Sequence, residues 1–275
     1  MMQICPGRPD RTPLMSERKM RLLRRLFTAF TSQPPVWSDA PLAPQAPFYA
    51  IGDIHGRGDL LARILDRIAS DSPTPNPRVV CVGDYVDRGE DSAGVLRRLH
   101  ALTQDPDRRV TCLMGNHEDM MLKFLSDPAT HGPRWLRNGG LQTAASFGVG
   151  QISESTGAHG LINARDRLRG AMGDAMESWL RALPASWTSG NVTVVHAGAD
   201  PARALSDQDR STLIWGHASF LTTPRTDGNW LVFGHTVMAE PYAKLGRIAI
   251  DTGAYATGRL TAVRIGQNTA RFLQA

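Results

Sequence analysis

Short apolar segments alternate with helical segments through the first half of this chain, and glycine-flanked polar residues follow each apolar segment. The runs at 48–52, 79–83 and 110–115 have the composition of buried strands, and apolar residues recur with helical spacing at 59–69 and 92–102. This order predicts a parallel sheet with right-handed helical crossovers. Reactive groups in such sheets gather beyond the carboxyl ends of the strands, so the loops that follow these runs form the candidate site.

The rest of the chain divides into a helical part and a second group of strands. Residues 127–186 carry little strand pattern and are interpreted as a helical insertion, with helices at 134–147 and 165–183. We expect the later strands to form a second sheet packed against the first, and they lie at 192–196, 230–233, 247–250 and 260–265.

The basic character of the chain resides in its N-terminal arm. The net charge is +5 and the pI is about 9.5, but the arm, residues 1–46, holds seven arginine and lysine residues against three acidic ones, so the rest of the chain is close to neutral. We therefore expect no specific nucleic-acid partner. Within the arm, 14–30 has the pattern of a basic amphipathic helix and 33–47 that of a proline-rich linker. We expect the arm either to contact a membrane surface or a partner, or to be a solvated extension. Residues 47–275 are expected to form the catalytic domain.

Cysteine usage and hydropathy favour a cytoplasmic bacterial enzyme. Cys81 and Cys112 lie in apolar, strand-like runs, and neither they nor Cys5 show Cys-x-x-Cys spacing, which is typical of reduced packing residues. No run reaches the roughly 18 apolar residues of a membrane-spanning helix. The arm also lacks the pattern of a secretory signal.

The polar residues after the strands form an inventory suited to two divalent metals. They fall into five glycine-containing motifs: Gly52-Asp53-Ile54-His55-Gly56, Gly83-Asp84-Tyr85-Val86-Asp87-Arg88-Gly89, Gly115-Asn116-His117-Glu118, His196-Ala197-Gly198 and Gly234-His235-Thr236. Asp53 and His55 are two apart on extended backbone and point the same way, and the carboxylate of Asp84 can bridge two ions. Asn116, His196 and His235 offer further oxygen and nitrogen ligands. Such a set without thiolates suits manganese, iron, zinc or cobalt.

The same motifs supply groups for the hydrolysis of a phosphate ester. His117 follows Asn116 and is free to act as a general acid on the leaving oxygen. Asp87 is placed to orient that imidazole, and Arg88 can bind phosphate oxygens bidentately. One aspartate or histidine at a strand end is usually a helix cap or a loop residue, and Glu118 is explained by the start of its helix. Six candidate ligands at strand ends are hard to attribute to chance.

These motifs resemble those of the phosphoprotein phosphatase family of calcineurin-like metallophosphoesterases, over about 49–263. Trp135-Leu136-Arg137-Asn138-Gly139-Gly140, Thr143, Ser146-Phe147-Gly148 and Ile250-Asp251-Thr252-Gly253-Ala254 further resemble its bacterial members. The resemblance implies an α/β fold, an αββα sandwich of two mixed sheets flanked by helices. It implies a first metal on Asp53, His55 and Asp84. The second metal would be bound by Asp84, Asn116, His196 and His235. His117 would be the general acid, paired with Asp87, and Arg88 and Asn116 would bind the phosphate of the substrate.

One departure from the family pattern concerns a second phosphate-binding arginine. Bacterial relatives often carry it two residues after a tryptophan, where this chain has His217. His217 is therefore a candidate phosphate contact, and Tyr255 a candidate for the rim of the site. Three arginines are near enough in sequence to substitute: Arg203, Arg210 and Arg225.

The resemblance favours a serine/threonine protein phosphatase that uses metal-activated water and two divalent ions, most naturally Mn²⁺. Its substrate would be a phosphorylated protein or a small phosphoester. A symmetrical dinucleoside tetraphosphate hydrolase is the alternative, although relatives with that activity usually carry glutamine in place of His55. A catalytically silent scaffold acting through 14–30 is a third reading, and it requires a broken ligand set, whereas this set is complete.

Overall fold

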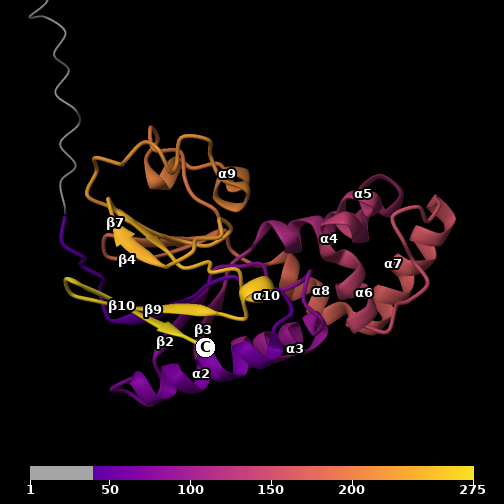
Figure 1. Cartoon of the computed structure of the whole chain (residues 1–275), viewed down its shortest axis with the longest axis horizontal. Coiled ribbons are helices and arrows are strands. Elements are labelled where there is room, and N and C mark those ends of the chain that lie inside the picture. Colours follow the sequence, from indigo (N-terminus) through magenta and orange to yellow (C-terminus); the bar gives the residue numbers. More distant parts are fainter. Residues whose placement is uncertain (1–39) are drawn as a thin grey trace, which may run out of the picture. The chain divides into compact units, whose positions relative to one another are not determined.

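The computed structural model describes residues 40–275, and these residues form two mixed β-sheets with helices packed against them (Figure 1). The first sheet has the order β10-β9-β1-β2-β3, with β1 (Phe48–Ile51), β2 (Arg78–Cys81), β3 (Arg109–Cys112), β9 (Thr261–Gly266) and β10 (Thr269–Gln274). The second has the order β4-β5-β6-β8-β7, with β4 (Ser186–Ser189), β5 (Val192–Val195), β6 (Trp230–Phe233), β7 (Tyr242–Lys244) and β8 (Arg247–Ala249). The expected αββα class is confirmed.

Alternation along the central strands explains why each sheet can be covered on both faces. In β1, Phe48 and Ala50 belong to the apolar cluster between the two sheets, whereas Tyr49 and Ile51 face the cluster that packs against helices. Successive side chains of a strand point to opposite faces, so both faces of this fully buried strand are apolar. The other face of the second sheet packs a smaller cluster that includes Phe220 and Phe233.

Helices cover the outer face of the first sheet and continue into a helical region beside it (Figure 1). α2 (Gly58–Asp71) and α3 (Ser92–Gln104) are the crossovers between parallel strands, and α4 (Asn116–Ser126) follows β3. The helical region then comprises α5 (Pro128–Trp135), the π-helix η1 (Leu136–Gly140), α6 (Leu141–Ser146), α7 (Ala158–Met172) and α8 (Asp174–Arg181). Later in the chain come η2 (Leu205–Asp207), α9 (Arg210–Trp215) and α10 (Ala254–Thr257).

Three expectations from the sequence were wrong in detail. The helix expected at 134–147 is interrupted at Gly139, where φ is 103°. The helix expected at 165–183 is divided by Gly173, where φ is 81°. Both values lie in the left-handed region that an α-helix cannot contain. The strand expected at 260–265 pairs antiparallel with β1 and so belongs to the first sheet.

Residues 40–46, assigned from sequence to the arm, are bound along the second sheet. The indole nitrogen of Trp230 donates to the carbonyl of Ala40 at 2.7 Å, and the side-chain oxygen of Asn191 accepts from the amide of Ala43 at 2.8 Å. Leu42 is buried in the cluster between the sheets. The amphipathic helix expected at 14–30 lies outside the described residues. Between residues 40 and 275, no helix combines the length and apolar character needed to cross a membrane.

Candidate functional site

The candidate site lies where parallel strands of both sheets end. Asp53 follows β1, Asp84 follows β2 and Asn116 begins α4 after β3, and β1, β2 and β3 are mutually parallel. His196 follows β5 and His235 follows β6, which are parallel in the second sheet. Parallel strands end at one edge of their sheet, which is why these five residues converge although 182 positions separate Asp53 from His235.

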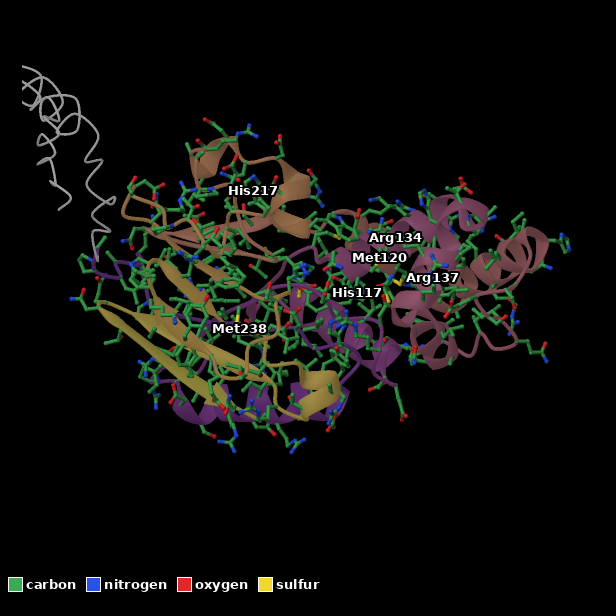
Figure 2. All side chains as sticks on the ribbon, turned by 45° about the horizontal axis from the view of Figure 1, so that its top comes forward. His117, Met120, Arg134, Arg137, His217 and Met238 are labelled. Atoms are coloured by element: carbon green, nitrogen blue, oxygen red, sulfur yellow. The ribbon has the colours of Figure 1, made fainter. Side chains whose placement is uncertain are left out.

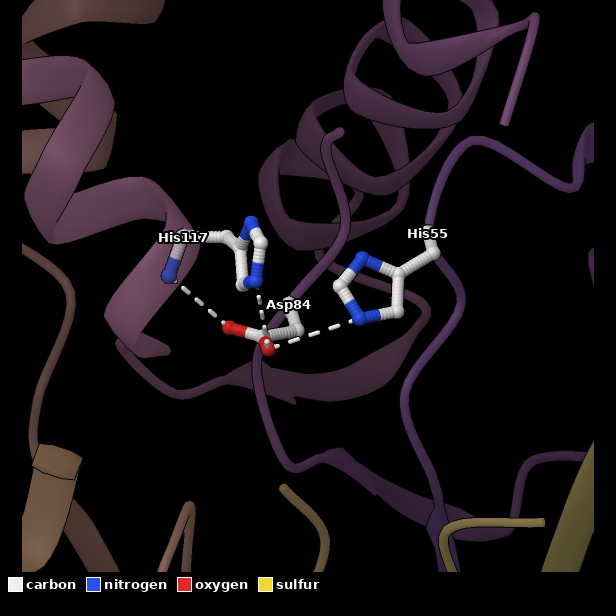
Figure 3. Close-up of side chains that lie close together, drawn as sticks. All are labelled: His55, Asp84 and His117. Carbon is white, nitrogen blue, oxygen red and sulfur yellow. Dashed lines mark hydrogen bonds and ion pairs between the residues drawn. The ribbon is translucent and has the colours of Figure 1, made fainter. Parts of the chain in front are cut away.

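Asp84 is central to two groups of possible metal ligands. Its Oδ2 lies 3.5 Å from His55 Nε2 and 3.9 Å from His117 Nε2 (Figure 3). Its Oδ1 lies 3.3 Å from His196 Nε2. The two carboxylate oxygens therefore face different histidines, as a bridging ligand requires.

Asn116 and His235 complete the second group. The side-chain oxygen of Asn116 lies 2.8 Å from His196 Nε2 and 2.8 Å from His235 Nδ1. The backbone amide of His235 donates to Asp53 Oδ2 at 2.9 Å. The other oxygen of Asp53, Oδ1, is buried and has no hydrogen-bond partner. A buried carboxylate oxygen without a partner is costly unless a cation compensates it.

The electrostatics of these side chains also fit cations. Burial, together with the carboxylates of Asp251 and Asp84, raises the pKa of Asp53 well above its usual value. Burial lowers the pKa of His55 to about 3 and that of His235 to about 4, so both imidazoles are neutral and have a free lone pair. Burial alone would raise the pKa of Asp84, but the facing imidazoles, His196 first, bring it well below its usual value.

The six side chains thus fit a pair of divalent cations. They combine carboxylate, imidazole and amide donors without sulfur, a set that suits manganese, iron, zinc or cobalt. The residues that would hold the ions are Asp53, His55, Asp84, Asn116, His196 and His235. His117 lies within ligand distance of His55 and Asp84, but it differs from the other histidines because its Nδ1 is hydrogen-bonded to Asp87.

His117, Asp87 and Arg88 form a chain beside these ligands. His117 Nδ1 lies 2.7 Å from Asp87 Oδ2, and Arg88 Nη2 lies 3.2 Å from His117 Nε2. Burial would lower the pKa of His117, but the carboxylates of Asp84 and Asp87 outweigh it and raise that pKa. A buried imidazole with a raised pKa, oriented by a carboxylate, is suited to donate a proton. His117 lies between the sheets and the helical region that carries Arg134 and Arg137 (Figure 2).

Tyr255 lies at the rim of the site. Its ring is edge-on to the His55 imidazole, with 5.3 Å between centroids, and the Arg88 guanidinium carbon lies 4.6 Å from the ring centroid. A cavity of about 490 Å³ opens beside them, lined among others by Arg57, Arg88 and Tyr255. This cavity is the space next to the phosphate-binding candidate Arg88.

Each of the three arginines considered as substitutes contacts a residue outside the candidate ligand set. Arg203 pairs with Asp209, Arg210 donates to the carbonyl of Leu183, and Arg225 pairs with Asp227.

His217 instead lines a cavity of about 310 Å³ together with His235 and Trp215. The side chain at the position of the missing arginine is therefore beside a candidate metal ligand.

The backbone is left-handed at many site residues. The φ angles are 45° at His55, 52° at Asp84, 71° at Asp87, 70° at Arg88 and 62° at His235. Such φ values are unfavourable for residues with a Cβ and persist only where the surrounding structure imposes them. Their concentration here indicates that the loops are held in a required geometry.

Glu118 organises these loops, a role that the sequence interpretation missed. Its carboxylate is buried and accepts hydrogen bonds from backbone amides of Asp84 at 2.8 Å, Tyr85 at 2.7 Å and Gly115 at 3.0 Å. A fourth bond, from Val86, is 3.2 Å long. The available signal in the sequence was the position of Glu118 directly after Asn116 and His117. A glutamate that only caps its helix would accept from the amide at the helix start, here that of Gly115, and not from the other three amides.

Comparison with known proteins agrees with this fold. The family model described as calcineurin-like phosphoesterase matches residues 46–239. No curated protein sequence matches this chain. Among solved structures, a putative diadenosine tetraphosphatase is 20% identical, with a TM-score of 0.58 and coverage of 84% of this chain and 94% of that one.

Two further structures are similar at lower identity. A cold-active protein-tyrosine phosphatase of Shewanella is 17% identical, with a TM-score of 0.54 and coverage of 85% of this chain and 83% of that one. A protein serine/threonine phosphatase from Saccharomyces cerevisiae is 16% identical, with a TM-score of 0.51 and coverage of 84% and 80%. At these identities the likeness shows the fold alone. The family match spans well over half of the chain, and the protein therefore belongs to the calcineurin-like phosphoesterase family.

Proposed function

We propose that this protein is a serine/threonine protein phosphatase that hydrolyses phosphomonoesters with two divalent metal ions, Mn²⁺ being the natural candidate. The observation that carries the proposal is the sequence of contacts Asp87–His117–Arg88 beside Asp84. In this proposal Arg88 is the phosphate-binding cation and His117 the proton donor, and their contact at the edge of the candidate ligands supports these roles. The choice of phosphoserine and phosphothreonine rests on the resemblance of the five motifs to phosphoprotein phosphatases.

The residues have separable tasks in this reaction. Arg88 binds two phosphate oxygens and orients the ester. Water adds its oxygen to phosphorus, the P–O bond to the side chain breaks, and the leaving oxygen takes the proton of His117 Nε2. One proton of the water stays on the phosphate product, the other passes to solvent, and solvent returns a proton to His117. Asp87 holds His117 Nδ1 and stabilises the imidazolium before this transfer. Two bound ions would lower the pKa of the attacking water and neutralise phosphate charge.

Steady-state hydrolysis tests the proposal. Phosphoserine, phosphothreonine and phosphotyrosine peptides of one sequence would be compared, with p-nitrophenyl phosphate as a general substrate and Mn²⁺ added. We expect turnover of p-nitrophenyl phosphate and a higher kcat/KM for the first two peptides than for the third. Absence of turnover with every substrate refutes the phosphatase, and preference for phosphotyrosine refutes the serine/threonine assignment.

A symmetrical dinucleoside tetraphosphate hydrolase is the second candidate. The cavity beside Arg88 and Tyr255 favours it, because an arginine and an aromatic ring next to the candidate site suit a further phosphate and a base. Diadenosine tetraphosphate would be included in the same assay. A kcat/KM for this substrate above that for every phosphopeptide reverses the order of the two candidates.

A further inference from the structure

The two oxygens of the Asp87 carboxylate have different partners. Oδ2 accepts a hydrogen bond from His117 Nδ1 at 2.7 Å. Oδ1 accepts a hydrogen bond from the Trp135 indole at 3.1 Å and one from the Thr143 hydroxyl at 2.7 Å. Both donors come from α5 and α6, 48 and 56 residues after Asp87, and not from the strand loops that carry the candidate metal ligands.

The same helical region also holds the backbone of the Asp87–Arg88 turn. The Asp87 amide donates to Thr143 Oγ1 at 2.8 Å, and the Arg88 amide donates to the carbonyl of Gly139 at 3.3 Å. Both turn residues have left-handed φ angles, 71° and 70°. A Cβ at Gly139 would lie 2.4 Å from the Arg88 nitrogen, so the kinked π-helix can approach the turn only with glycine here.

Packing fixes the Trp135 donor in place. Trp135 is fully buried, and its ring stacks on Phe124 with 4.5 Å between centroids. Gly140 also lies against the indole, and a Cβ there would be 2.5 Å from the ring. The indole cannot swing away from Asp87 without opening this contact. Thr143 is also fully buried.

We propose that Trp135 and Thr143 are positioning residues for the proton donor. By occupying Asp87 Oδ1 they leave Oδ2 for His117, and this fixes the imidazole with Nδ1 toward Asp87 and Nε2 toward Arg88 and the leaving oxygen. The inference rests on the proposed phosphatase function, since it concerns the step in which His117 protonates the leaving group. It assigns the helical region a direct part in catalytic geometry.

Leaving-group dependence separates this role from a general structural one. An alkoxide such as that of serine departs only with a proton, whereas p-nitrophenolate departs readily without one. Loss of His117 positioning should therefore slow a phosphoserine peptide much more than p-nitrophenyl phosphate. Partial unfolding would instead lower both rates by the same factor.

The variants are Thr143→Val and Trp135→Phe, which remove a donor and keep most of the packing. We expect kcat for the phosphoserine peptide to fall by about 10- to 100-fold, the usual effect of losing a partner of a site residue, with a small change in KM. The decrease for p-nitrophenyl phosphate should be several times smaller. Thr143→Ser, which keeps the hydroxyl, should restore the peptide rate. Thr103→Val and Trp179→Phe, remote from this cluster, serve as matched controls.

Proton NMR of the metal-free full chain gives a readout that does not depend on turnover. The His117 Nδ1 proton, assigned by its loss in His117→Asn, should give a downfield resonance in the wild type, Thr143→Ser and both controls. It should shift upfield or disappear in Thr143→Val and Trp135→Phe.

Two results overturn the inference: an unchanged resonance in both donor variants, or equal proportional losses for the two substrates. If the wild type hydrolyses neither substrate, the proposed function fails, and the resonance alone then decides whether Trp135 and Thr143 order His117.

Discussion

The Nη2 atom of Arg88 lies 3.2 Å from Nε2 of His117. A phosphate bound by the arginine would therefore have its ester oxygen beside the nitrogen that donates the proton. The Tyr255 ring lies over the guanidinium with 4.6 Å between the guanidinium carbon and the centroid, which further restricts its position. In the proposed reaction, this geometry would couple phosphate binding to proton donation.

Replacing Arg88 by lysine should weaken phosphate binding while retaining the charge. Lysine cannot form the two parallel bonds of a guanidinium, and a hydrogen bond to a charged group contributes about 1.5–3 kcal/mol. We expect Arg88→Lys to lower kcat/KM by about 10- to 100-fold and to raise the Ki of inorganic phosphate. Arg63→Lys, on the exposed face of α2, is the control. Unchanged phosphate inhibition would remove Arg88 from this role.

His117→Asn should reduce kcat for a phosphoserine peptide by about 10²–10⁴, because general acid catalysis carries that weight. KM should change little, since His117 is not assigned to binding. Steady-state kinetics over a range of peptide concentrations provides the measurement, with His159→Asn as a control. Near-normal kcat would show that another group protonates the leaving oxygen.

Glu118→Gln should destabilise the fold as well as the site. Glutamine has one acceptor oxygen in place of two, and its NH₂ group would face the backbone amides that the second oxygen now satisfies. An unsatisfied buried group costs about 1–3 kcal/mol, so the free energy of unfolding should fall by about that amount. Urea denaturation of this variant and of Glu154→Gln, which is exposed, would measure it. Equal stability of the two variants contradicts the role of Glu118.

Asp59 provides a pH-dependent contribution to stability. Its hydrogen bonds with the Arg57 guanidinium lower the pKa of Asp59 from 3.8 to about 2. The contribution is therefore complete above the unfolded pKa of 3.8 and is lost as the pH falls through about 2. Asp59 is 54% exposed, so solvent screening keeps the effect of Asp59→Asn below about 1 kcal/mol at pH 7. Urea denaturation should show the difference from wild type vanishing near pH 2, and a constant difference contradicts it.

The strands that bear the site could be predicted because they are short, continuously apolar and followed by glycine-flanked polar residues. β6 has the predicted bounds, Trp230–Phe233, and the strand predicted at 192–196 ends one residue early, at Val195. Their parallel order also brings Asp84, Asn116 and His196 together as expected. These features depend on local pattern and on the general geometry of parallel sheets.

The features that sequence reasoning missed depend on contacts between distant segments. The pairing of β9 with β1 joins strands about 210 residues apart, and no local pattern specifies it. The helical spacing of apolar residues continues through Gly139. The helix is nevertheless kinked there, because Gly139 packs directly against the backbone of Arg88. The contacts of Trp135 and Thr143 with Asp87 likewise appear only when the helical region is folded onto the site.

We propose that Asp53, Asp84 and their neighbours hold a pair of divalent ions. Binding to the native state alone would stabilise the fold, by about 2.7 kcal/mol when free ion exceeds Kd a hundredfold. Asp84→Asn removes the carboxylate that faces both groups of candidate ligands, and Asp66→Asn on the exposed face of α2 is its control.

The most direct measurement is elemental analysis of the purified full chain after equilibration with Mn²⁺ and removal of free ion, together with its thermal unfolding. We expect two ions per chain and a raised Tm for the wild type and Asp66→Asn, and neither for Asp84→Asn. A wild-type chain that retains no transition metal and whose Tm is unchanged by any of these ions would contradict the account.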